Sequence, residues 1–492
     1  MDIKKEIISA LKTLSKEFTN ENIEFLVEKP ENESFGDYAS NIALTLFNDK
    51  GLMINDKFKT PLELAKDIAE KLNNSSLIPN PCSRIEAAPP GFINFWLSKE
   101  YLVSNLSKSQ DLNKPLENKK VMVEFTDPNP FKEFHIGHLY SNTVGEALCR
   151  LLEAQGGVVK RVCYQGDVGL HVAKTLYGIQ NLKIKTQDLE KKSLKEKIKV
   201  LGKAYAFGSK TYEEDEKAKK EIEELNKKIY DKDPSVTALY KKGRQWSLEY
   251  FETIYKRLGT KFDFYYFESE VGKVGVSLVK EYLKKGVFRQ SDGAIIFPGE
   301  KYGLHTRVFI NSLGLPTYEA KDLGLAPTKY RDFPYDLSII ITAAEQRGYF
   351  KVVIKALSLI NPELGKKTTH ISHGVVRLPT GKMSSRSGNI ITGEWLLDKA
   401  KKLLKNKYPE MTEDILEKVA AGSVKYALLK GSIGHDIEFD FEESINIQGN
   451  SGPYLQYTFV RTQSVLKKVK KFNTTKYYTF SRKLSLELEE LS

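Results

Sequence analysis

Two short motifs carry residues that could bind a nucleotide. The first is His135–Ile136–Gly137–His138, which stands where a proline-containing loop leads into a segment with helical periodicity. The first turn of a helix offers unpaired N–H groups and a partial positive charge, which suit a phosphate. Two histidines there can donate hydrogen bonds to an α-phosphate as it becomes pentavalent, and Gly137 leaves room for an adenine ring. This motif therefore predicts an ATP site.

Other interpretations of the histidine motif stay open when it is taken alone. A His-x-x-His pair can occur by chance on a helix, and it can also bind zinc. A zinc site needs a further ligand and a catalytic acid or base, and the neighbouring residues do not supply the HExxH pattern. We therefore expect no metal held tightly by protein side chains.

The second motif is KMSSR at residues 382–386, in a loop between Gly381 and Gly388. Its cations could bind a triphosphate, Lys382 as a point charge and Arg386 as a planar fork. A P-loop is excluded, because the glycines before the lysine are separated by six residues rather than four. A solvated basic loop is an equally good interpretation of this motif alone.

The elements around the first motif predict a doubly wound parallel sheet. A buried strand at 120–125 precedes the loop and the helix that begins at His135, and a second strand follows at 158–165. Strand, loop, helix and strand in this order begin an α/β fold. Further strands are expected to complete the same sheet at 293–299, 307–310 and 336–342.

The length of the chain corresponds to about three domains. Residues 1–110 indicate a small α/β domain, and residues 118–393 a Rossmann-like catalytic domain. A stretch rich in Lys and Glu at about 181–260 indicates solvated helices inserted in that domain. From 394 to 492 the pattern is helical.

Composition restricts the class of protein. Lysine and arginine exceed aspartate and glutamate by 12, which is weak support for a polyanionic partner. The cysteines Cys82, Cys149 and Cys163 form no CxxC, so a disulfide scaffold and a cysteine zinc site are excluded. The sequence begins with no secretory pattern and contains no apolar run of the roughly 18 residues a membrane helix needs. We expect a cytoplasmic protein with no membrane partner.

Together, and in this order, the two motifs resemble the paired signatures of class I aminoacyl-tRNA synthetases. The resemblance is closest to the arginyl-tRNA synthetase family and covers almost the whole chain. The matching blocks are GDYASNIAL (36–44), PPGFINFWL (89–97), DPNPFKEFHIGHL (127–139), YQGDVG (164–169), TYEAKDLGLA (317–326), AAEQRGYF (343–350) and GNSGPYLQYTFVRTQSVLKK (449–468).

The resemblance implies ATP-dependent ligation of L-arginine to tRNA(Arg) through an arginyl-adenylate, with release of AMP and pyrophosphate. It implies Mg²⁺ accompanying ATP, a tRNA-recognising N-terminal domain, a helical anticodon-binding region and activation that requires tRNA. A monomer is expected. The catalytic residues it implies are Lys132, His135, Gly137, His138, Lys382, Ser384 and Arg386, and the arginine pocket it implies is Asn129, Glu268, Tyr318, Asp322 and Gln346.

The chemistry of these pocket residues suits arginine. A guanidinium has five donors and no acceptor, so the carboxylates of Glu268 and Asp322 are fitting partners. Tyr318 and Asp322 share one face if their segment is helical. Asn129, with His138, is placed to hold the α-amino and carboxylate groups, and Gln346 is expected to assist. Without the resemblance, Glu268 would be interpreted as a solvated strand end and Asp322 as a surface acid or helix cap.

The sequence departs from the family pattern in two places. Ser385 stands where the family usually has a second lysine, and Lys132, three residues before His135, is expected to compensate by binding phosphate. The alternative interpretation of Lys132 is an ordinary exposed lysine with no part in binding phosphate. Family members also usually continue beyond the final ELEELS, so the helical region at 394–492 is expected to be incomplete, as a fragment or a natural loss.

Three other functions remain open on the sequence alone. A lysyl or glutaminyl ligase of class I would share both motifs. A tRNA-binding relative without ligase activity would fit a shortened helical region, although it would not need His135, His138 and Lys382. A nucleotidyltransferase would share only the histidine motif and would not explain the terminal domains.

Overall fold

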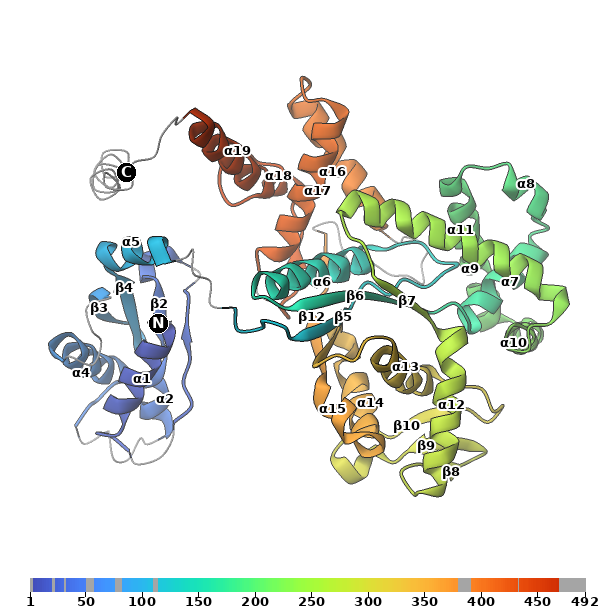
Figure 1. Cartoon of the computed structure of the whole chain (residues 1–492), viewed down its shortest axis with the longest axis horizontal. Coiled ribbons are helices and arrows are strands. Elements are labelled where there is room, and N and C mark those ends of the chain that lie inside the picture. Colours follow the sequence, from blue (N-terminus) through green and yellow to red (C-terminus); the bar gives the residue numbers. More distant parts are fainter. Residues whose placement is uncertain are drawn as a thin grey trace. The chain divides into compact units, whose positions relative to one another are not determined.

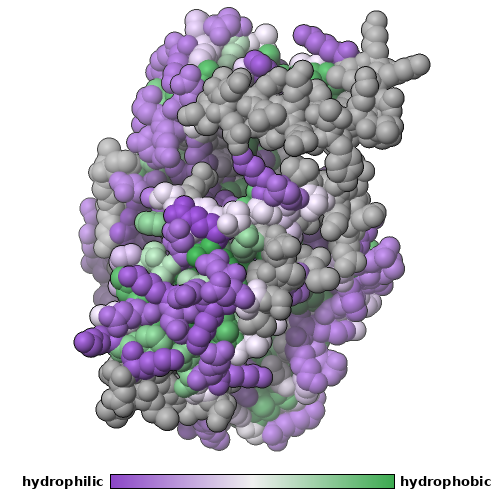
Figure 2. Space-filling view, turned by 90° about the vertical axis from the view of Figure 1, so that its left-hand side faces the viewer, coloured by the Kyte–Doolittle hydropathy of each residue, from purple (hydrophilic) through white to green (hydrophobic). Residues whose placement is uncertain are grey.

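The computed structural model describes residues 3–19, 23–30, 32–49, 57–75, 82–108, 114–378, 391–431 and 433–468. The chain divides into two compact units, with the boundary between Asn113 and Lys114 (Figure 1). Within the described residues, no helix is both long and apolar enough to span a membrane. Hydrophilic residues cover most of the coloured surface on the face shown in Figure 2, and hydrophobic residues form smaller patches there.

The first unit is a small sheet with helices. Its strands are antiparallel in the order β1-β2-β4-β3. Thr60 caps α4 by accepting a hydrogen bond from the backbone of Glu63, and apolar residues at helical spacing on α4 enter the core. The elements are α1 (Ile3–Ser15), β1 (Val27–Glu28), β2 (Tyr38–Ser40), α2 (Ile42–Asp49), α4 (Pro61–Asn74), β3 (Cys82–Ala88), β4 (Phe92–Leu97) and α5 (Lys99–Lys108).

The second unit contains a five-stranded parallel sheet in the order β12-β11-β5-β6-β7. The chain starts at the centre with β5, adds β6 and β7 on one side, and later adds β11 and β12 on the other. The order therefore reverses between β5 and β11, and ligands of such sheets bind at the carboxyl ends of the strands there. The strands are β5 (Lys120–Glu124), β6 (Val158–Gln165), β7 (Phe264–Phe267), β11 (Leu337–Ala343) and β12 (Thr368–His373).

Both faces of this sheet are buried. Along β5, Val121 and Val123 belong to one hydrophobic cluster and Met122 belongs to another. Successive side chains of a strand point to opposite faces, so the continuous apolar run in the sequence corresponds to helices on both sides. The helices of the layers are α6 (Ile136–Ala154), α7 (Leu170–Asn181), α12 (Glu268–Lys284), α13 (Tyr318–Asp332), α14 (Arg347–Ile360) and α15 (Pro362–Lys367).

One expectation about the sheet was wrong. The runs at 293–299 and 307–310 do not join the parallel sheet but form an antiparallel sheet of order β10-β9-β8. Asp292 and Gly293 connect β8 to β9 with φ of 49° and 77°, and a tight two-residue turn of this kind makes a hairpin. Edge strands β7 and β12 complete the parallel sheet instead. The hairpin strands are β8 (Arg289–Ser291), β9 (Ala294–Phe297) and β10 (Arg307–Ile310).

Helices make up most of the remaining chain. The stretch between α7 and β7 forms α8 (Thr186–Glu190), α9 (Leu194–Glu214), α10 (Glu216–Tyr230) and α11 (Pro234–Leu258). Ser193 and Glu196 form a capping box at the start of α9. The described residues after the sheet form α16 (Gly393–Lys407), α17 (Glu413–Leu429), α18 (Phe441–Ser444) and α19 (Gly452–Lys468), and β14 (Ile437–Glu438) pairs with β13 (Val376–Arg377).

Candidate active site

The loop between β5 and α6 has a strained backbone. Thr126, Asp127 and Phe131 have φ of 82°, 44° and 69°, values that non-glycine residues rarely adopt. The backbone N–H of Thr126 donates to Ser141 Oγ at 3.0 Å, and Asn142 Nδ2 donates to Thr126 Oγ1 at 3.0 Å. Strain of this kind persists only where surrounding contacts hold it, and it gathers at functional sites.

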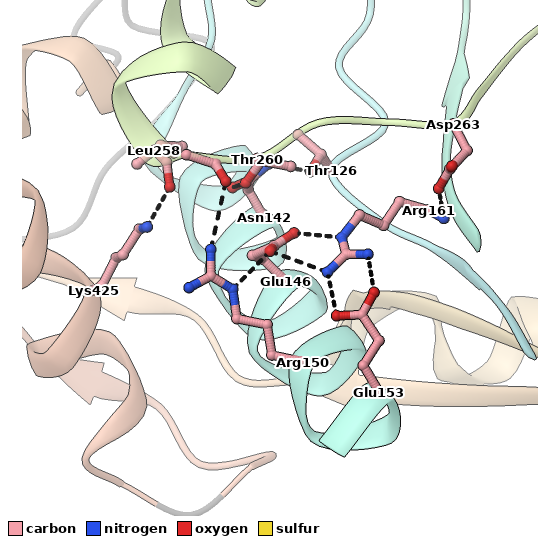
Figure 3. Close-up of polar contacts among 11 residues, drawn as sticks. Thr126, Asn142, Glu146, Arg150, Glu153, Arg161, Leu258, Thr260, Asp263 and Lys425 are labelled. Carbon is pink, nitrogen blue, oxygen red and sulfur yellow. Dashed lines mark hydrogen bonds and ion pairs between the residues drawn. The ribbon is translucent and has the colours of Figure 1, made fainter. Parts of the chain in front are cut away.

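Asn142 connects the strained loop to the chain beyond α11. It is fully buried on α6, and Thr260 Oγ1 donates to its Oδ1 at 2.9 Å (Figure 3). The backbone N–H of Phe131 donates to Ser247 Oγ of α11 at 2.9 Å. The loop that precedes the histidine motif is therefore fixed by α6 and α11 together.

The two histidines lie at the N-terminus of α6 and cap each other. His135 Nδ1 accepts from the backbone N–H of His138, and His138 Nδ1 accepts from that of His135, both at 3.3 Å. The rings stack with centroids 3.5 Å apart. Burial and the nearby charge of Lys132 lower the pKa of His135 to about 4, and burial followed by His135 lowers the pKa of His138. Both imidazoles are therefore neutral at pH 7.

Neutral rings whose Nδ1 atoms accept must carry their proton on Nε2. This geometry assigns the same tautomer to His135 and His138. Each ring then retains one N–H donor, at Nε2, that the cap does not use. Gly137, between them, has only the His135 ring near the position that a Cβ would take, at 3.1 Å. Donors of this kind at a helix N-terminus can bind a phosphoryl oxygen.

Lys382, Ser384 and Arg386 lie outside the described residues. The chain reappears at Ile391, whose carbonyl accepts a hydrogen bond from Ile136 N at 3.0 Å. Gly393 N donates to the carbonyl of Phe134 at 2.8 Å. The residues that follow the second motif are thus bonded directly to the first.

Lys132 lies close enough to the histidines for its charge to lower both of their pKa values. Its ammonium faces the ring of Tyr205 on α9, 4.6 Å from the centroid. The structure therefore places Lys132 near the helix mouth, with the ammonium held against an aromatic ring rather than against the imidazoles.

Asn129 and Glu268 converge on Gly166, in the turn after β6. A Cβ added at Gly166 would lie 2.3 Å from Asn129 Oδ1 and 3.0 Å from Glu268 Oε1. Glu268 is the first residue of α12, directly after β7, and it is buried. Two residues predicted to contact one substrate therefore approach each other from beyond the carboxyl ends of β5 and β7, on either side of β6, and only glycine fits between them.

Tyr318 and Asp322 share the first turns of α13, as their spacing predicts. Asp322 Oδ2 accepts a hydrogen bond from the hydroxyl of Tyr349 at 2.6 Å. Burial, with repulsion from carboxylates that include Glu124 and Glu268, raises the pKa of Asp322 to about 8, although the bond from Tyr349 opposes the shift. Asp322 is therefore largely protonated at pH 7.

Gln346 is less closely integrated into this group. It ends a short 3-10 helix (Ala344–Gln346) after β11, at the same edge of the sheet, and it is exposed. Among the described residues, its side chain makes no hydrogen bond with the other predicted pocket residues. Tyr318 is also 54% exposed, so the pocket is open on this side.

Two buried ion pairs beneath the pocket were not predicted. Lys321 Nζ lies 2.5 Å from Glu268 Oε2, and Lys329 Nζ lies 2.6 Å from Glu124 Oε2. Both lysines are on α13, whose sequence gives no sign of their burial, because lysines are usually exposed. Sequence analysis also left out Asp167, which is fully buried and accepts hydrogen bonds from Ser269 N and Oγ at the start of α12.

A large groove opens beside Glu268, with an accessible volume of about 1290 Å³. It lies between α11 and α12, and its walls include Asp167, Tyr230, Tyr240, Arg244 and Lys273. Pockets for single small molecules usually measure roughly 300–1,000 Å³. This groove is therefore larger than one amino acid requires.

Two family models match this chain. The family described as "tRNA synthetases class I (R), catalytic domain" matches residues 101–441, and "Arginyl tRNA synthetase N terminal domain" matches residues 1–97. An arginine–tRNA ligase of Borreliella burgdorferi is 32% identical, over 93% of this chain and 79% of the relative. One of Fusobacterium nucleatum is 33% identical, over 90% and 77%.

Solved structures show the same fold. Arginyl-tRNA synthetase from Plasmodium falciparum aligns with a TM-score of 0.66 at 23% identity, over 96% of this chain and 82% of that one. The Thermus thermophilus enzyme aligns with a TM-score of 0.64 at 20% identity, over 96% and 83%.

A parallel sheet with a histidine-capped helix at its switch point, together with these matches, defines a class I aminoacyl-tRNA synthetase. Within that class, the N-terminal domain match and relatives above 30% identity are decisive. The chain belongs to the arginyl-tRNA synthetase family.

Proposed function

We propose that this chain ligates L-arginine to tRNA(Arg) at the expense of ATP, through an arginyl-adenylate. The observation that carries the proposal is the convergence of Asn129 and Glu268 on Gly166, at the same sheet edge as the histidine pair. This edge offers a polar and acidic pocket next to phosphate-binding donors. Family membership gives the reaction, and this geometry supports the roles of the residues.

The first step places the arginine carboxylate against the α-phosphate of ATP. The carboxylate oxygen attacks phosphorus, and pyrophosphate leaves. We assign the Nε2–H groups of His135 and His138 to the phosphoryl oxygens, which gain charge in the transition state. Lys132 and the segment with Lys382, Ser384 and Arg386 are assigned to the remaining phosphates. None of these side chains needs to act as a nucleophile, because positioning and charge stabilisation suffice.

In the second step, the terminal ribose hydroxyl of tRNA(Arg) attacks the carbonyl carbon of the adenylate and expels AMP. During both steps, Asn129 would hold the α-amino group, with Gln346 closing the open side. Glu268 and Asp322 would receive the guanidinium, and Tyr318 would cover it. A charge-assisted hydrogen bond contributes roughly 1.5–3 kcal/mol, so two carboxylates explain a strong preference for a cationic side chain.

We propose that Mg²⁺ enters with ATP rather than occupying a site of its own. Among the described residues, no three His, Cys, Asp or Glu side chains come together to hold a metal. Mg²⁺ commonly binds substrate phosphates and water with one or two carboxylates, so the nucleotide would supply most of its ligands.

The charge of the chain and its free cysteines bear on its partners and its location. The net charge of +12 suits tRNA, and we assign its recognition to residues 1–110 and the anticodon to the helical region from 394. On α19, Arg461 donates a hydrogen bond at 2.8 Å to the hydroxyl of the exposed Tyr457, and arginine and aromatic side chains are residue types on which bases stack. We propose a cytoplasmic monomer; the free thiols of Cys82, Cys149 and Cys163 fit a reducing compartment.

The test is pyrophosphate exchange and tRNA charging with arginine, lysine and glutamine, with and without tRNA(Arg). Of the three amino acids, only arginine should support both reactions. Glu268→Gln should raise the KM for arginine about tenfold or more. Preference for lysine or glutamine would overturn the substrate assignment. Equal charging by the wild type and His138→Ala would overturn the catalytic role and favour a tRNA-binding relative without ligase activity.

A further inference from the structure

Glu268 is not free to meet a substrate with both of its oxygens. Its Oε2 lies 2.5 Å from Nζ of Lys321, and the two residues are 4% and 3% exposed. Glu268 begins α12, whereas Lys321 is on α13, directly before Asp322. A charged pair this deeply buried is expensive to desolvate, so its presence at a binding pocket calls for a functional explanation.

The two oxygens of Glu268 face different surroundings. Oε1 lies on the side of Gly166 and Asn129, where the substrate is proposed to bind. Oε2 is taken by Lys321, on the opposite side of the carboxylate. Oε1 is therefore available to a substrate, whereas Oε2 is already paired with the ammonium of Lys321.

Lys321 itself is held in place. Its Cγ lies 3.5 Å from the position that a Cβ at Gly272 would take. Its ammonium faces the rings of Tyr318 and Tyr230, at 4.9 Å and 5.8 Å from their centroids. Tyr230 ends α10, so helices on two sides enclose the ammonium. This lysine cannot turn to solvent without leaving Glu268 unpaired.

We propose that Lys321 is a positioning residue that sets arginine specificity by keeping Glu268 ionised and limiting it to one substrate contact. The inference rests on the proposed function. A guanidinium then meets Oε1 of Glu268 on one side and Asp322 on another, which suits a planar fork with separated N–H groups. The ammonium of lysine is a compact point charge and cannot bridge two separated carboxylates equally well.

The groups around Glu268 determine its charge once Lys321 is removed. Burial already raises the pKa of Glu268, and Lys321 is the largest influence that opposes this shift. Without the lysine, burial and the charge of Asp167 are opposed mainly by Lys132, so the pKa of Glu268 rises further. The titratable or charged groups that face Glu268 are Lys132, Tyr164, Asp167, Tyr230, Tyr318, Lys321, Asp322 and Tyr349.

The test compares Lys321→Met with the wild type in pyrophosphate exchange from about pH 6 to about pH 9, with tRNA present. At pH 7 the KM for arginine should rise about tenfold or more, while kcat at saturating arginine changes less. The ratio of variant to wild-type KM should fall as the pH rises, because Glu268 ionises. Discrimination between arginine and lysine, as a ratio of kcat/KM, should also weaken. Lys321→Arg should keep the wild-type pH profile.

A matched control breaks another partly buried ion pair. Arg161 of β6 binds Glu146 and Glu153 of α6 (Figure 3), and none of these three belongs to the predicted pocket. Arg161→Met should lower the melting temperature. Its ratio of variant to wild-type KM for arginine should not change with pH. A flat ratio and unchanged discrimination in Lys321→Met would overturn the proposal.

Failure of the proposed function gives a different result. If Glu268→Gln leaves the KM for arginine unchanged, the pocket itself is wrongly assigned, whatever Lys321→Met does. If Glu268→Gln raises the KM and Lys321→Met shows no pH-dependent ratio, only the role of Lys321 is wrong. Should Lys321→Met lose its native circular-dichroism spectrum, Lys321→Gln supplies the same comparison, because it keeps a hydrogen-bond donor and removes the charge.

Discussion

The backbone N–H of Ile136 donates a hydrogen bond to the carbonyl of Ile391, at 3.0 Å. Ile136 is the first residue of α6, inside the histidine motif, and Ile391 is the first described residue after the segment that carries Lys382. The two motifs are far apart in the sequence, yet this bond joins their flanks. The chain that follows the second motif is therefore bonded to the first turn of α6.

Gly166→Ala should damage arginine binding selectively. The new Cβ would lie 2.3 Å from Asn129 Oδ1 and 3.0 Å from Glu268 Oε1, so at least one of these side chains must move. We expect the KM for arginine to rise about tenfold or more, with a smaller change in the KM for ATP. Gly431→Ala is the control, since its Cβ meets nothing within 4 Å. Equal KM values for arginine in both variants would contradict the assignment of Asn129 and Glu268 to the arginine pocket.

Arginine binding should release a proton at pH 7. The pKa of Asp322 is raised to about 8, so its carboxyl is mostly protonated before the guanidinium arrives and must ionise to pair with it. Affinity for arginine should therefore increase as the pH rises toward about 8. Calorimetry in two buffers with different ionisation enthalpies measures the release, which should approach one proton. Asp322→Asn should abolish it, and an unchanged release in that variant would refute this assignment.

The same shift has a consequence for stability. Between the unfolded value of 3.8 and the folded value of about 8, the folded state binds more protons at Asp322 than the unfolded state does. The contribution of this group to the free energy of unfolding therefore falls as the pH rises through that window. Asp322→Asn should remove this part of the pH dependence. Urea unfolding of both proteins at about pH 5 and pH 8 checks the sign.

The histidines should not titrate near neutrality. The pKa of His135 is lowered to about 4, and burial also lowers the pKa of His138, so both rings are neutral at pH 7. The profile of kcat for pyrophosphate exchange should show no inflection near pH 6.5. His138→Ala should lower kcat about 10²-fold or more, as expected for loss of a donor to developing charge. His305→Ala, remote from the motif in the sequence, should leave kcat unchanged.

Asn142→Ala should weaken both the fold and the reaction. It removes the acceptor for Thr260 and the donor to Thr126, whose φ of 82° depends on its surroundings. Loss of two buried hydrogen bonds predicts a decrease of about 1–3 kcal/mol in the free energy of unfolding, together with a lower kcat. Asn73→Ala, which loses one bond to the carbonyl of Ile85 in the first unit, should leave kcat unchanged. A full kcat in Asn142→Ala would show that the loop does not need this support.

Local pattern was sufficient for the elements that carry the site. Helical periodicity after a proline-containing loop placed His135 at a helix N-terminus, and the four-residue spacing of Tyr318 and Asp322 placed them on one helix. The expectation that was wrong concerns contacts between segments that are distant in the sequence. The strands at 293–299 and 307–310 look like sheet strands, but the sequence does not show which sheet they join.

The sequence by itself determined the periodicity of the elements and the two motifs, and its resemblance to a family implied which residues form the arginine pocket. Only the tertiary structure decided that Oε1 of Glu268 faces Asn129 while Oε2 faces Lys321, and that Lys329 is buried against Glu124. The reason is physical. Periodicity depends on neighbours a few positions away, whereas these contacts join distant residues through the strand order of the sheet.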